Sequence, residues 1–564
     1  MTQTVSLSPK VIVLGMDGAT FDLMRPWAQA GHLPNLARLM HNGYHAPLRS
    51  TLQPVTSAAW ASFMTGVNQG KHGLYDFIQR QDESYDVKVT TGNQIHFPTI
   101  FDIASTAGKR VISINMPYTY PTRRVNGLMI SGPFAPQLSE DAVYPQDLLP
   151  EIKSLVPDYF IFPEFDAQHS EPLTDYLEKL LQEIEQREQL SLHYLRTREW
   201  DLFSVVFMAT DEVQHAYWHL MDTRHPQYGN AILRVYQRVD EAIGRIIAAL
   251  EEIPGEKTIF IVSDHGGGAL KWVLNLNRWL ADEGFLTFQG GGKGIATRVK
   301  GKILQTLSAT YKQFTPPTVR ARIRSRLGNH KFNQIKGALE TQLLAAPIDW
   351  QRTQVYALGA GGNLFINLSG REPQGIVTPG AAYETLREQV IERLYTLKDP
   401  ASGQAIIKKV YRKEEIYHGK YLSQAPDLII EWMDYTTWGR GRYDSQASLF
   451  EAQNHLEFST IPLTGTHRPH GILIMYGDTL EIHSDWSVQP HHITDIAPTI
   501  LGLLNIPIPR VVDGQALTSV LRPQVQQRFT KLTSDMKRES AEVFSYNLED
   551  EEKILERLRS LGYL

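Results

Sequence analysis

The sequence predicts an α/β fold in which helices sandwich a central, mostly parallel sheet, with inserted cap segments. Short runs of branched apolar residues alternate along the chain with long helical patterns, which is the order that builds parallel sheets. These runs are apolar at nearly every position, as expected of strands that are covered on both faces. At 564 residues the chain exceeds one ordinary domain, which predicts a large core with insertions.

The predicted strands and helices alternate in chain order. Buried, parallel strands are expected at residues 11–16, 110–116, 202–209, 258–263 and 471–477. The apolar spacing of residues 173–195 and 231–253 predicts two long helices. A further helix is expected to start within the sequence DIAPTIL, with Asp495 as its N-cap.

Shifts in composition divide the chain into a core, an inserted cap and a tail. We expect the core at residues 1–280 and 460–525, with an insertion at 133–200 that is rich in Pro, acidic and aromatic residues. The expected cap region covers residues 281–459. The expected tail covers residues 526–564. Its last part, residues 545–564, is acidic and then amphipathic, which predicts a terminal helix on the body of the protein or on a second subunit.

One segment of the cap is strongly basic. Residues 284–339 carry eleven Lys or Arg and no Asp or Glu, and apolar spacing around these charges predicts basic helices. Two interpretations stay open. The helices are either a solvated cover over the functional site or a surface for an anionic partner, namely a phosphorylated substrate, nucleic acid or an acidic membrane surface.

The overall composition is that of a soluble globular protein, with 42% hydrophobic and 21% charged residues and a net charge of -5. The absence of cysteine excludes disulfides, thiolate metal sites, cysteine nucleophiles and a cysteine-derived formylglycine. The first residues show no secretory signal pattern, and no window approaches the ~18 uninterrupted apolar residues of a membrane span. We therefore expect a cytoplasmic protein.

Three aspartates lie near the carboxyl ends of predicted strands. They are Asp17, Asp211 and Asp264. Because ligands collect at the carboxyl ends of parallel strands, these carboxylates are expected to lie close together. His215 stands four residues after Asp211, so the two side chains share one face of a helix and can bind one ion.

Two further segments supply imidazoles. Asp264 and His265 lie in the sequence SDHGGG, in which the glycines permit positive φ and close backbone approach, and a tight turn there can bring both side chains to one ion. His467, in the sequence GTHRPHG, precedes its predicted strand and has to reach the site from a loop.

Thr56 is the candidate nucleophile. It lies at the start of a predicted helix, where N–H groups and the helix dipole stabilise anions such as phosphate. A bound metal ion lowers the pKa of such a hydroxyl and makes the alkoxide available. The same position also suits a simple N-cap.

Several neighbouring side chains compete with these assignments. Ser57 is an alternative hydroxyl, His470 is an alternative to His467, and Glu212 and His219 lie beside the pair Asp211 and His215. His72 is expected to be a structural histidine.

Together these segments predict a site for two divalent ions. Asp, His and hydroxyl ligands suit Zn²⁺, with Mn²⁺ as the alternative. Two ions about 3.5–4 Å apart clamp the attacking and leaving oxygens of an in-line displacement at phosphorus. The predicted ligands are Asp17, Thr56, Asp211, His215, Asp264, His265 and His467.

With these motifs the chain resembles the alkaline phosphatase superfamily, and within it the type I phosphodiesterase/nucleotide pyrophosphatase branch and a group of phosphohydrolase/phosphomutase-like proteins. The resemblance covers roughly residues 10–120, 200–290 and 355–520. It implies an alkaline-phosphatase-like sheet and assigns one ion to Asp211, His215 and His467. It assigns the other ion to Asp17, Thr56, Asp264 and His265, and it implies a phospho-enzyme on Thr56.

The chain departs from the diesterase pattern at one position. Diesterase relatives place an Asn three residues after the nucleophile, where it binds a phosphate oxygen, and this chain has Ala59 there. The Arg that phosphomonoesterases use for this purpose is not evident either. Asn68, Lys71 and Arg468 are the candidates for this role in the present chain.

The leading hypothesis is a metal-dependent phosphohydrolase that acts on a small phosphorylated substrate, with a phosphodiester or nucleotide pyrophosphate favoured over a monoester. The same site also fits a phosphomutase or a phosphomonoesterase. The non-enzymatic alternative is a protein that binds an anionic ligand through residues 284–339. A dinucleotide-binding oxidoreductase is disfavoured because LGAGGN (358–363) lacks the strand–GxGxxG–helix context.

Overall fold

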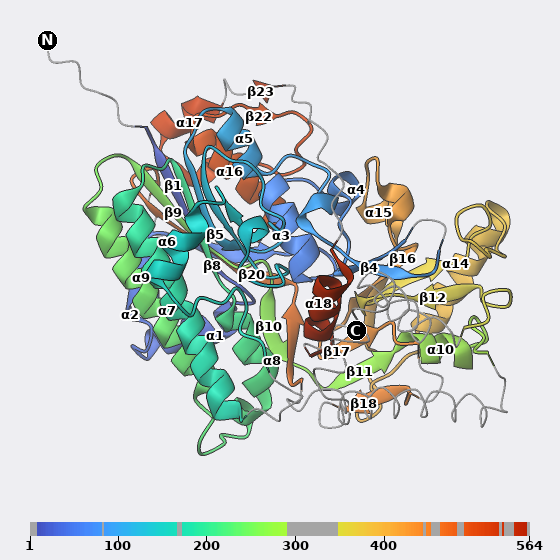
Figure 1. The fold of residues 1–564 in the computed structure, drawn as a ribbon. Helices are drawn as coiled ribbons and strands as arrows, with labels where there is room; N and C mark the ends of the chain where they lie inside the picture. The colour runs from blue at the N-terminus through green and yellow to red at the C-terminus, as the bar shows by residue number, and fades with distance from the viewer. Residues whose placement is uncertain are drawn as a thin grey trace, which may run out of the picture.

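Figure 1 shows the fold in a computed structural model of the protein. The structure describes residues 8–81, 84–165, 172–289, 348–443, 447–452, 463–481, 490–529, 533–534 and 546–560. Most of the basic segment at 284–339 lies outside the described residues. Among the described residues, no helix combines the length and the apolar character that crossing a bilayer requires.

A nine-stranded sheet forms the centre of the described residues, in the order β21-β2-β20-β9-β1-β8-β5-β6-β7. The strands are β1 (Lys10–Met16), β2 (Tyr44–Arg49), β5 (Val111–Met116), β6 (Gly127–Ser131), β7 (Val143–Tyr144), β8 (Leu202–Phe207), β9 (Lys257–Val262), β20 (His470–Gly477) and β21 (His491–His492). Strands β9, β1, β8, β5 and β6 are parallel to one another, which confirms the α/β prediction.

One predicted strand runs in the opposite direction. Strand β20 is antiparallel to both β9 and β2, whereas the sequence predicted a parallel strand. An apolar run shows that a strand is buried on both faces but does not show its direction. The reversal has a functional consequence, because it places the residues before β20, including His467, beside the carboxyl end of β9.

Helices cover both faces of the sheet (Figure 1). One group contains α1 (Phe21–Gln29), α2 (Pro34–Asn42), α6 (Leu148–Leu155), α7 (Leu173–Thr197), α8 (Ala209–Asp222) and α9 (Ala231–Glu251). The other contains α3 (Thr56–Thr65), α4 (Gln69–His72), α5 (Ile100–Thr106), α16 (Ile496–Leu503) and α17 (Pro523–Phe529). Helices α7 and α9 confirm the two long helices predicted from apolar spacing.

Smaller sheets lie beside the central one. Two four-stranded sheets have the orders β13-β17-β11-β18 and β12-β14-β16-β15, and three pairs are β10-β19, β22-β23 and β3-β4. Their strands are β3 (Ile78–Arg80), β4 (Val87–Val89), β10 (Gly266–Ala269), β11 (Trp272–Asn275), β12 (Val355–Ala357), β13 (Ala360–Gly361), β14 (Asn363–Ile366), β15 (Ile407–Arg412), β16 (Leu428–Trp432), β17 (Thr437–Arg440), β18 (Phe450–Ala452), β19 (Gly465–Arg468), β22 (Ile508–Pro509) and β23 (Thr533–Ser534). Helices α10 (Leu276–Asp282), α14 (Ala381–Leu394) and α15 (Lys413–Ile416) accompany the four-stranded sheets. The division into core, cap and tail remains a prediction.

Asp495 is the N-cap residue of α16, as predicted, but its side chain makes no cap bond to this helix. Its Oδ2 accepts from the N–H of His492 at 2.8 Å and its Oδ1 accepts from the N–H of Gln515 at 2.8 Å. The side chain therefore closes the short 3₁₀ turn Ile493–Asp495, while α16 starts at Ile496 without a side-chain cap bond.

The tail contains a terminal helix that contacts the body of the protein. Helix α18 (Leu548–Ser560) buries Ile554 and Leu558 completely. Oε1 of Glu551 accepts from the N–H of Val89 in β4 at 3.1 Å. The buried Arg557 stacks over the ring of Phe162.

Candidate metal centre

The structure brings all seven predicted site residues together at the carboxyl ends of β1, β8 and β9. Asp17 directly follows β1, Asp264 and His265 follow β9, and α8 starts two residues after β8 and carries Asp211 and His215. His467 comes from β19 and Thr56 is the first residue of α3. None of the seven is more than 5% exposed, so the site is buried and its groups interact at low effective dielectric.

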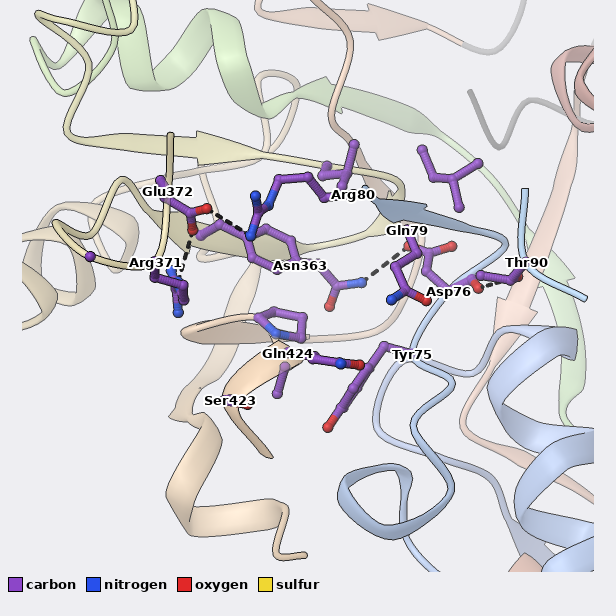
Figure 2. Close-up of a pocket in the computed structure, with 16 residues that line it drawn as sticks. Tyr75, Asp76, Gln79, Arg80, Thr90, Asn363, Arg371, Glu372, Ser423 and Gln424 are labelled. Atoms are coloured by element: carbon purple, nitrogen blue, oxygen red, sulfur yellow. Dashed lines mark hydrogen bonds and ion pairs between the residues drawn. The ribbon is translucent and has the colours of Figure 1, made fainter. Parts of the chain in front are cut away.

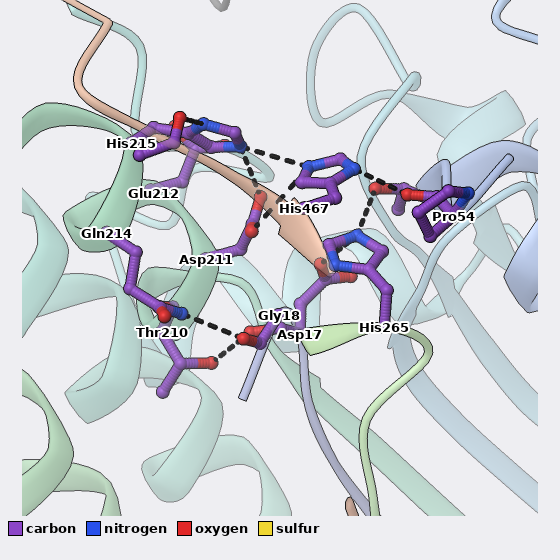
Figure 3. Close-up of polar contacts among 12 residues, drawn as sticks. Asp17, Gly18, Pro54, Thr210, Asp211, Glu212, Gln214, His215, His265 and His467 are labelled. Atoms are coloured by element: carbon purple, nitrogen blue, oxygen red, sulfur yellow. Dashed lines mark hydrogen bonds and ion pairs between the residues drawn. The ribbon is translucent and has the colours of Figure 1, made fainter. Parts of the chain in front are cut away.

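One cluster lies around Asp211 (Figure 3). Nε2 of His215 is 3.1 Å from Oδ2 of Asp211, and Nε2 of His467 is 3.8 Å from Oδ1. The two Nε2 atoms are 3.1 Å apart. Possible ligand atoms of Asp211, His265 and His467 lie within 4.8 Å of one another, so their positions are close enough for one ion.

A second cluster lies around His265. Its Nε2 is 3.3 Å from Oδ2 of Asp264 and 3.7 Å from Oδ1 of Asp17. The hydroxyl oxygen of Thr56 is 3.3 Å from the same nitrogen. His265 belongs to both clusters, so the geometry groups it with Asp211 and His467 as well as with the set that the sequence assigned to it.

All three imidazoles are oriented in the same way. Nδ1 of His215 contacts the carbonyl oxygen of Gly465 at 2.9 Å, and Nδ1 of His467 contacts that of Pro54 at 2.6 Å. Nδ1 of His265 contacts the carbonyl oxygen of Gly266 at 3.1 Å. A carbonyl accepts only, so each Nδ1 donates a hydrogen bond and each Nε2 is directed to the site, where the neutral form of the ring can bind a metal ion. This second-sphere arrangement is typical of histidines that bind a metal ion.

The carboxylates carry large and opposite pKa shifts. Burial, followed by repulsion from Asp264 and Asp211, raises the pKa of Asp17 well above its usual range. Burial and then repulsion from Asp211 raise the pKa of Asp264 in the same way. Burial alone would raise the pKa of Asp211, but the imidazoles of His215 and His467 outweigh it and hold that pKa well below the usual value.

The imidazoles also differ from one another. Burial, together with the neighbouring His467, lowers the pKa of His265 well below its usual value, and burial lowers the pKa of His467. Burial opposes protonation of His215 as well, but Asp211 outweighs it and raises the pKa of His215 to about 9. In the protein without ions, Asp17 and Asp264 therefore favour their neutral forms, and His215 and Asp211 favour their charged forms.

The donor set fits divalent cations. Oδ1 of Asp17 and Oδ2 of Asp264 are completely buried and accept no hydrogen bond from any of the described residues. Such orphaned anionic oxygens are costly in a protein interior unless a cation satisfies them. Carboxylate oxygens with imidazole Nε2 atoms form the ligand set of zinc and manganese sites.

Gly18 allows the close approach between β1 and α8. It has φ +64°, and a Cβ at this position would lie 2.3 Å from Oδ1 of Asp211. Its carbonyl oxygen accepts from Nε2 of Gln214 at 2.9 Å. Any side chain at this position would displace Asp211.

We expect Gly18→Ala to abolish ion binding around Asp211 and to lower turnover by at least about 100-fold, because the ligand carboxylate is displaced. The matched control is Gly31→Ala. Gly31 has φ +80° and no heavy atom within 4 Å of an added Cβ, so it carries the same backbone strain without the clash. Equal effects of both substitutions on ion content and turnover would contradict this role of Gly18.

The three glycines after His265 allow close approach, as predicted, but they do not form a tight turn with positive φ. Residues 266–268 form strand β10 and pair with β19, where Gly267 lies opposite His467. None of the three has a positive φ. They are required for close contact, since a Cβ on Gly267 would lie 2.1 Å from Oε1 of Gln214 and one on Gly268 would lie 2.3 Å from Nε of Arg468.

Sequence reasoning missed three residues that hold the site in place. Nε1 of Trp60 donates to Oδ2 of Asp17 at 2.7 Å. The hydroxyl of Thr210 donates to the carbonyl oxygen of Asp17 at 2.6 Å, and Gln214 holds Gly18. A helical signal was available for Trp60, because it stands four residues after Thr56 and shares its face of α3.

The three candidates for binding a phosphate oxygen make other contacts. Nδ2 of Asn68 donates to Oδ2 of Asp513 at 2.8 Å, and Lys71 forms an ion pair with the same carboxylate. Arg468 donates to the carbonyl oxygens of Tyr435 and Ala269, both at 2.6 Å. These contacts do not support the suggested role of the three side chains.

The competing neighbours occupy other positions. Ser57 is completely buried, and Glu212 accepts from the hydroxyl of Tyr176 at 2.9 Å. His470 is exposed at the start of β20. His72 is a structural histidine, as predicted, since its Nε2 contacts Oγ of Ser62 at 3.0 Å.

The fold and this cluster define the class of the protein, an α/β protein with a buried candidate site for divalent ions. The chain belongs to the type I phosphodiesterase/nucleotide pyrophosphatase family, whose model matches residues 11–446. It is therefore a hydrolase that acts on phosphoester bonds. Among curated proteins, none matches this sequence.

Two solved structures were found to be similar to this chain. A phosphonoacetate hydrolase from Sinorhizobium meliloti 1021 superposes with a TM-score of 0.51 at 13% identity, covering 88% of this chain and 96% of that one. Human ectonucleotide pyrophosphatase/phosphodiesterase 5 matches with a TM-score of 0.47 at 13% identity, covering 91% of this chain and 100% of that one. The first likeness confirms the alkaline-phosphatase-like α/β architecture.

Proposed function

We propose that the protein is a two-metal phosphohydrolase that cleaves a phosphodiester or a nucleotide pyrophosphate through a phospho-enzyme on Thr56. The observation that carries this proposal is the position of the Thr56 hydroxyl, 3.3 Å from Nε2 of His265, where the two ligand clusters meet. We assign one ion to Asp211, His215 and His467, and the other to Asp17, Thr56, Asp264 and His265. Zn²⁺ is the favoured ion and Mn²⁺ is the alternative.

The bound ions supply Lewis acidity, which lowers the pKa of the Thr56 hydroxyl and neutralises charge on the phosphoryl oxygens. The residues of the chain supply position. Thr56 is held at the first turn of α3, and the first N–H groups of a helix have no partner within the helix. These N–H groups are available to donate to the phosphoryl oxygens. They would replace the Asn side chain of diesterase relatives, because Ala59 at that position has no polar side chain.

Thr56 attacks phosphorus and the leaving group departs from the opposite side. Water then attacks the phosphothreonine and releases the second product. In this arrangement the buried imidazoles keep their protons at Nδ1, held by the carbonyl oxygens of Pro54, Gly266 and Gly465. The site is therefore preorganised before the substrate arrives.

The charge of the site favours a singly charged phosphodiester. The three aspartates and the Thr56 alkoxide together balance the four positive charges of two divalent ions, so that no positive charge remains when the histidines are neutral. Among the described contacts, Arg468 and Lys71 are already bound to other groups, so they do not add charge for a doubly charged monoester. This balance supports diester cleavage over monoester cleavage.

The proposal is tested with a panel of substrates on the ion-loaded protein. We expect kcat/KM for bis(4-nitrophenyl) phosphate or a dinucleoside pyrophosphate to exceed that for 4-nitrophenyl phosphate by at least about tenfold. The same panel on Gly31→Ala controls for general effects of substitution. A clear preference for the monoester would contradict the proposed substrate class.

A further inference from the structure

None of the seven candidate ligands lines a second feature of the structure, a cavity of about 370 Å³. Its walls come from two distant parts of the sequence, residues 75–90 on one side and residues 358–372 with 423–426 on the other (Figure 2). Small-molecule sites commonly form where two separate parts of a fold meet, and their volumes are of this order.

The base of the cavity is formed by two buried polar side chains. Asp76 is 6% exposed and Asn363 is 3% exposed. Nδ2 of Asn363 donates to Oδ2 of Asp76 at 3.2 Å. This bond fixes the amide so that Oδ1 of Asn363 points into the space above Tyr75 and Gln424 (Figure 2).

The glycine-rich sequence LGAGGN is built around the Asp76 carboxylate. Gly359 has φ +73°, and a Cβ there would lie 2.1 Å from Oδ2 of Asp76. The N–H of Ala360 donates to the same oxygen at 3.0 Å. The two ends of this loop, Leu358 and Asn363, line the cavity. The loop therefore shapes a cavity wall, and this role accounts for Gly359, while Gly361 and Gly362 lie against Gln53.

The two arginines of the lining are already paired with carboxylates. Arg80 lies 2.8 Å from Oε2 of Glu372. Arg371 donates one hydrogen bond to Oε1 of Glu372 at 2.8 Å. It donates two more to the carboxylate of Asp427, at 2.8 and 2.6 Å. Both arginines therefore hold carboxylates, and a phosphate group would have to displace them.

Neutral hydrogen-bonding groups remain for a ligand. The amides of Gln79 and Gln424 and Oδ1 of Asn363 face the same space, beside the ring of Tyr75 (Figure 2). The Tyr75 hydroxyl already donates to the carbonyl oxygen of Tyr421 at 2.8 Å, so this residue offers its ring. Amides around an aromatic face suit an uncharged ring that bears several hydroxyl or amide groups.

We propose that this cavity is a second ligand site, which binds a neutral, hydroxyl- or amide-bearing small molecule of the size of a monosaccharide or a nucleoside. The site is independent of the metal centre. Both kinds of molecule present the same chemistry, and the two arms of the experiment distinguish between them.

The experiment measures binding to the ion-loaded, full-length protein by saturation-transfer NMR and calorimetry. One arm uses adenosine and uridine, the other uses glucose and N-acetylglucosamine, and AMP and glucose 6-phosphate serve as charged counterparts. We expect at least one neutral compound to bind, more tightly than its phosphorylated counterpart, and to bind equally to Thr56→Ala.

Variants locate the binding site. The double substitution Gln79→Leu/Gln424→Leu removes two amides at partly exposed positions and is expected to weaken binding by about tenfold or more. The matched control is Gln374→Leu, an exposed position outside the lining. The proposal is overturned if no neutral compound binds at millimolar concentration, if only the phosphorylated compounds bind, or if the double variant binds as the control does.

Discussion

Thr56→Ala is expected to lower kcat/KM on bis(4-nitrophenyl) phosphate by at least about 10³-fold, because the substitution removes the attacking oxygen. The six other ligands stay in place, so the two ions are expected to remain bound. If Thr56→Ala keeps its bound ions but loses turnover, Thr56 acts as the nucleophile and not merely as a structural residue. The measurement pairs steady-state kinetics with elemental analysis of the same sample.

Two further variants make this result specific. Thr56→Ser keeps a hydroxyl at the first turn of α3 and is expected to retain a measurable part of the activity. Ser57→Ala removes the neighbouring hydroxyl, which is completely buried, and is expected to turn over close to the wild-type rate. A fully active Thr56→Ala, or an inactive Ser57→Ala, would show that Thr56 is not the nucleophile.

Removal of the divalent ions is expected to abolish turnover and to destabilise the fold. Ions that bind only the folded state stabilise it by about 3 kcal/mol when their free concentration exceeds Kd a hundredfold. Chelation removes this contribution and leaves Asp17 and Asp264 buried beside Asp211. We therefore expect a lower Tm after chelation and full recovery of activity and Tm on addition of Zn²⁺ or Mn²⁺.

The loss of Tm on chelation should depend on pH in a defined direction. The folded pKa values of Asp17 and Asp264 lie above their usual values, so the ion-free folded state binds protons that the unfolded state releases. Its stability therefore falls as the pH rises through these raised values. Thermal unfolding with and without chelator should show a larger difference at pH 8 than at pH 5, and a constant difference would contradict the shifts.

Much of the site could be predicted from the sequence. Carboxylates after apolar strands converge in a parallel sheet, so Asp17, Asp211 and Asp264 could be placed at one edge without coordinates. The i, i+4 spacing of Asp211 and His215 places them on one face of α8. In each case a short-range pattern determines a position in space.

Features that depend on long-range contacts could not be predicted in this way. The direction of β20 is set by its pairing with β9 and β2, and the apolar run does not show which strands it pairs with. The glycines at 266–268 were interpreted as a turn because the approach of Gln214 and β19 is a tertiary contact. The carboxylate of Asp495 accepts from the N–H groups of His492 and Gln515 and therefore makes no cap bond to α16.

The central claim, a dinuclear site built from these seven side chains, is tested most directly by counting the bound ions. We predict about two divalent ions per chain in the purified wild-type protein after exchange into zinc. The variant His215→Ala is expected to bind about one ion, because His215 is assigned as a ligand of one ion and not of the other. Activity on bis(4-nitrophenyl) phosphate should follow the count during chelation and reloading. A protein that is fully active with no bound ion, or whose ion content is unchanged in His215→Ala, would contradict the account.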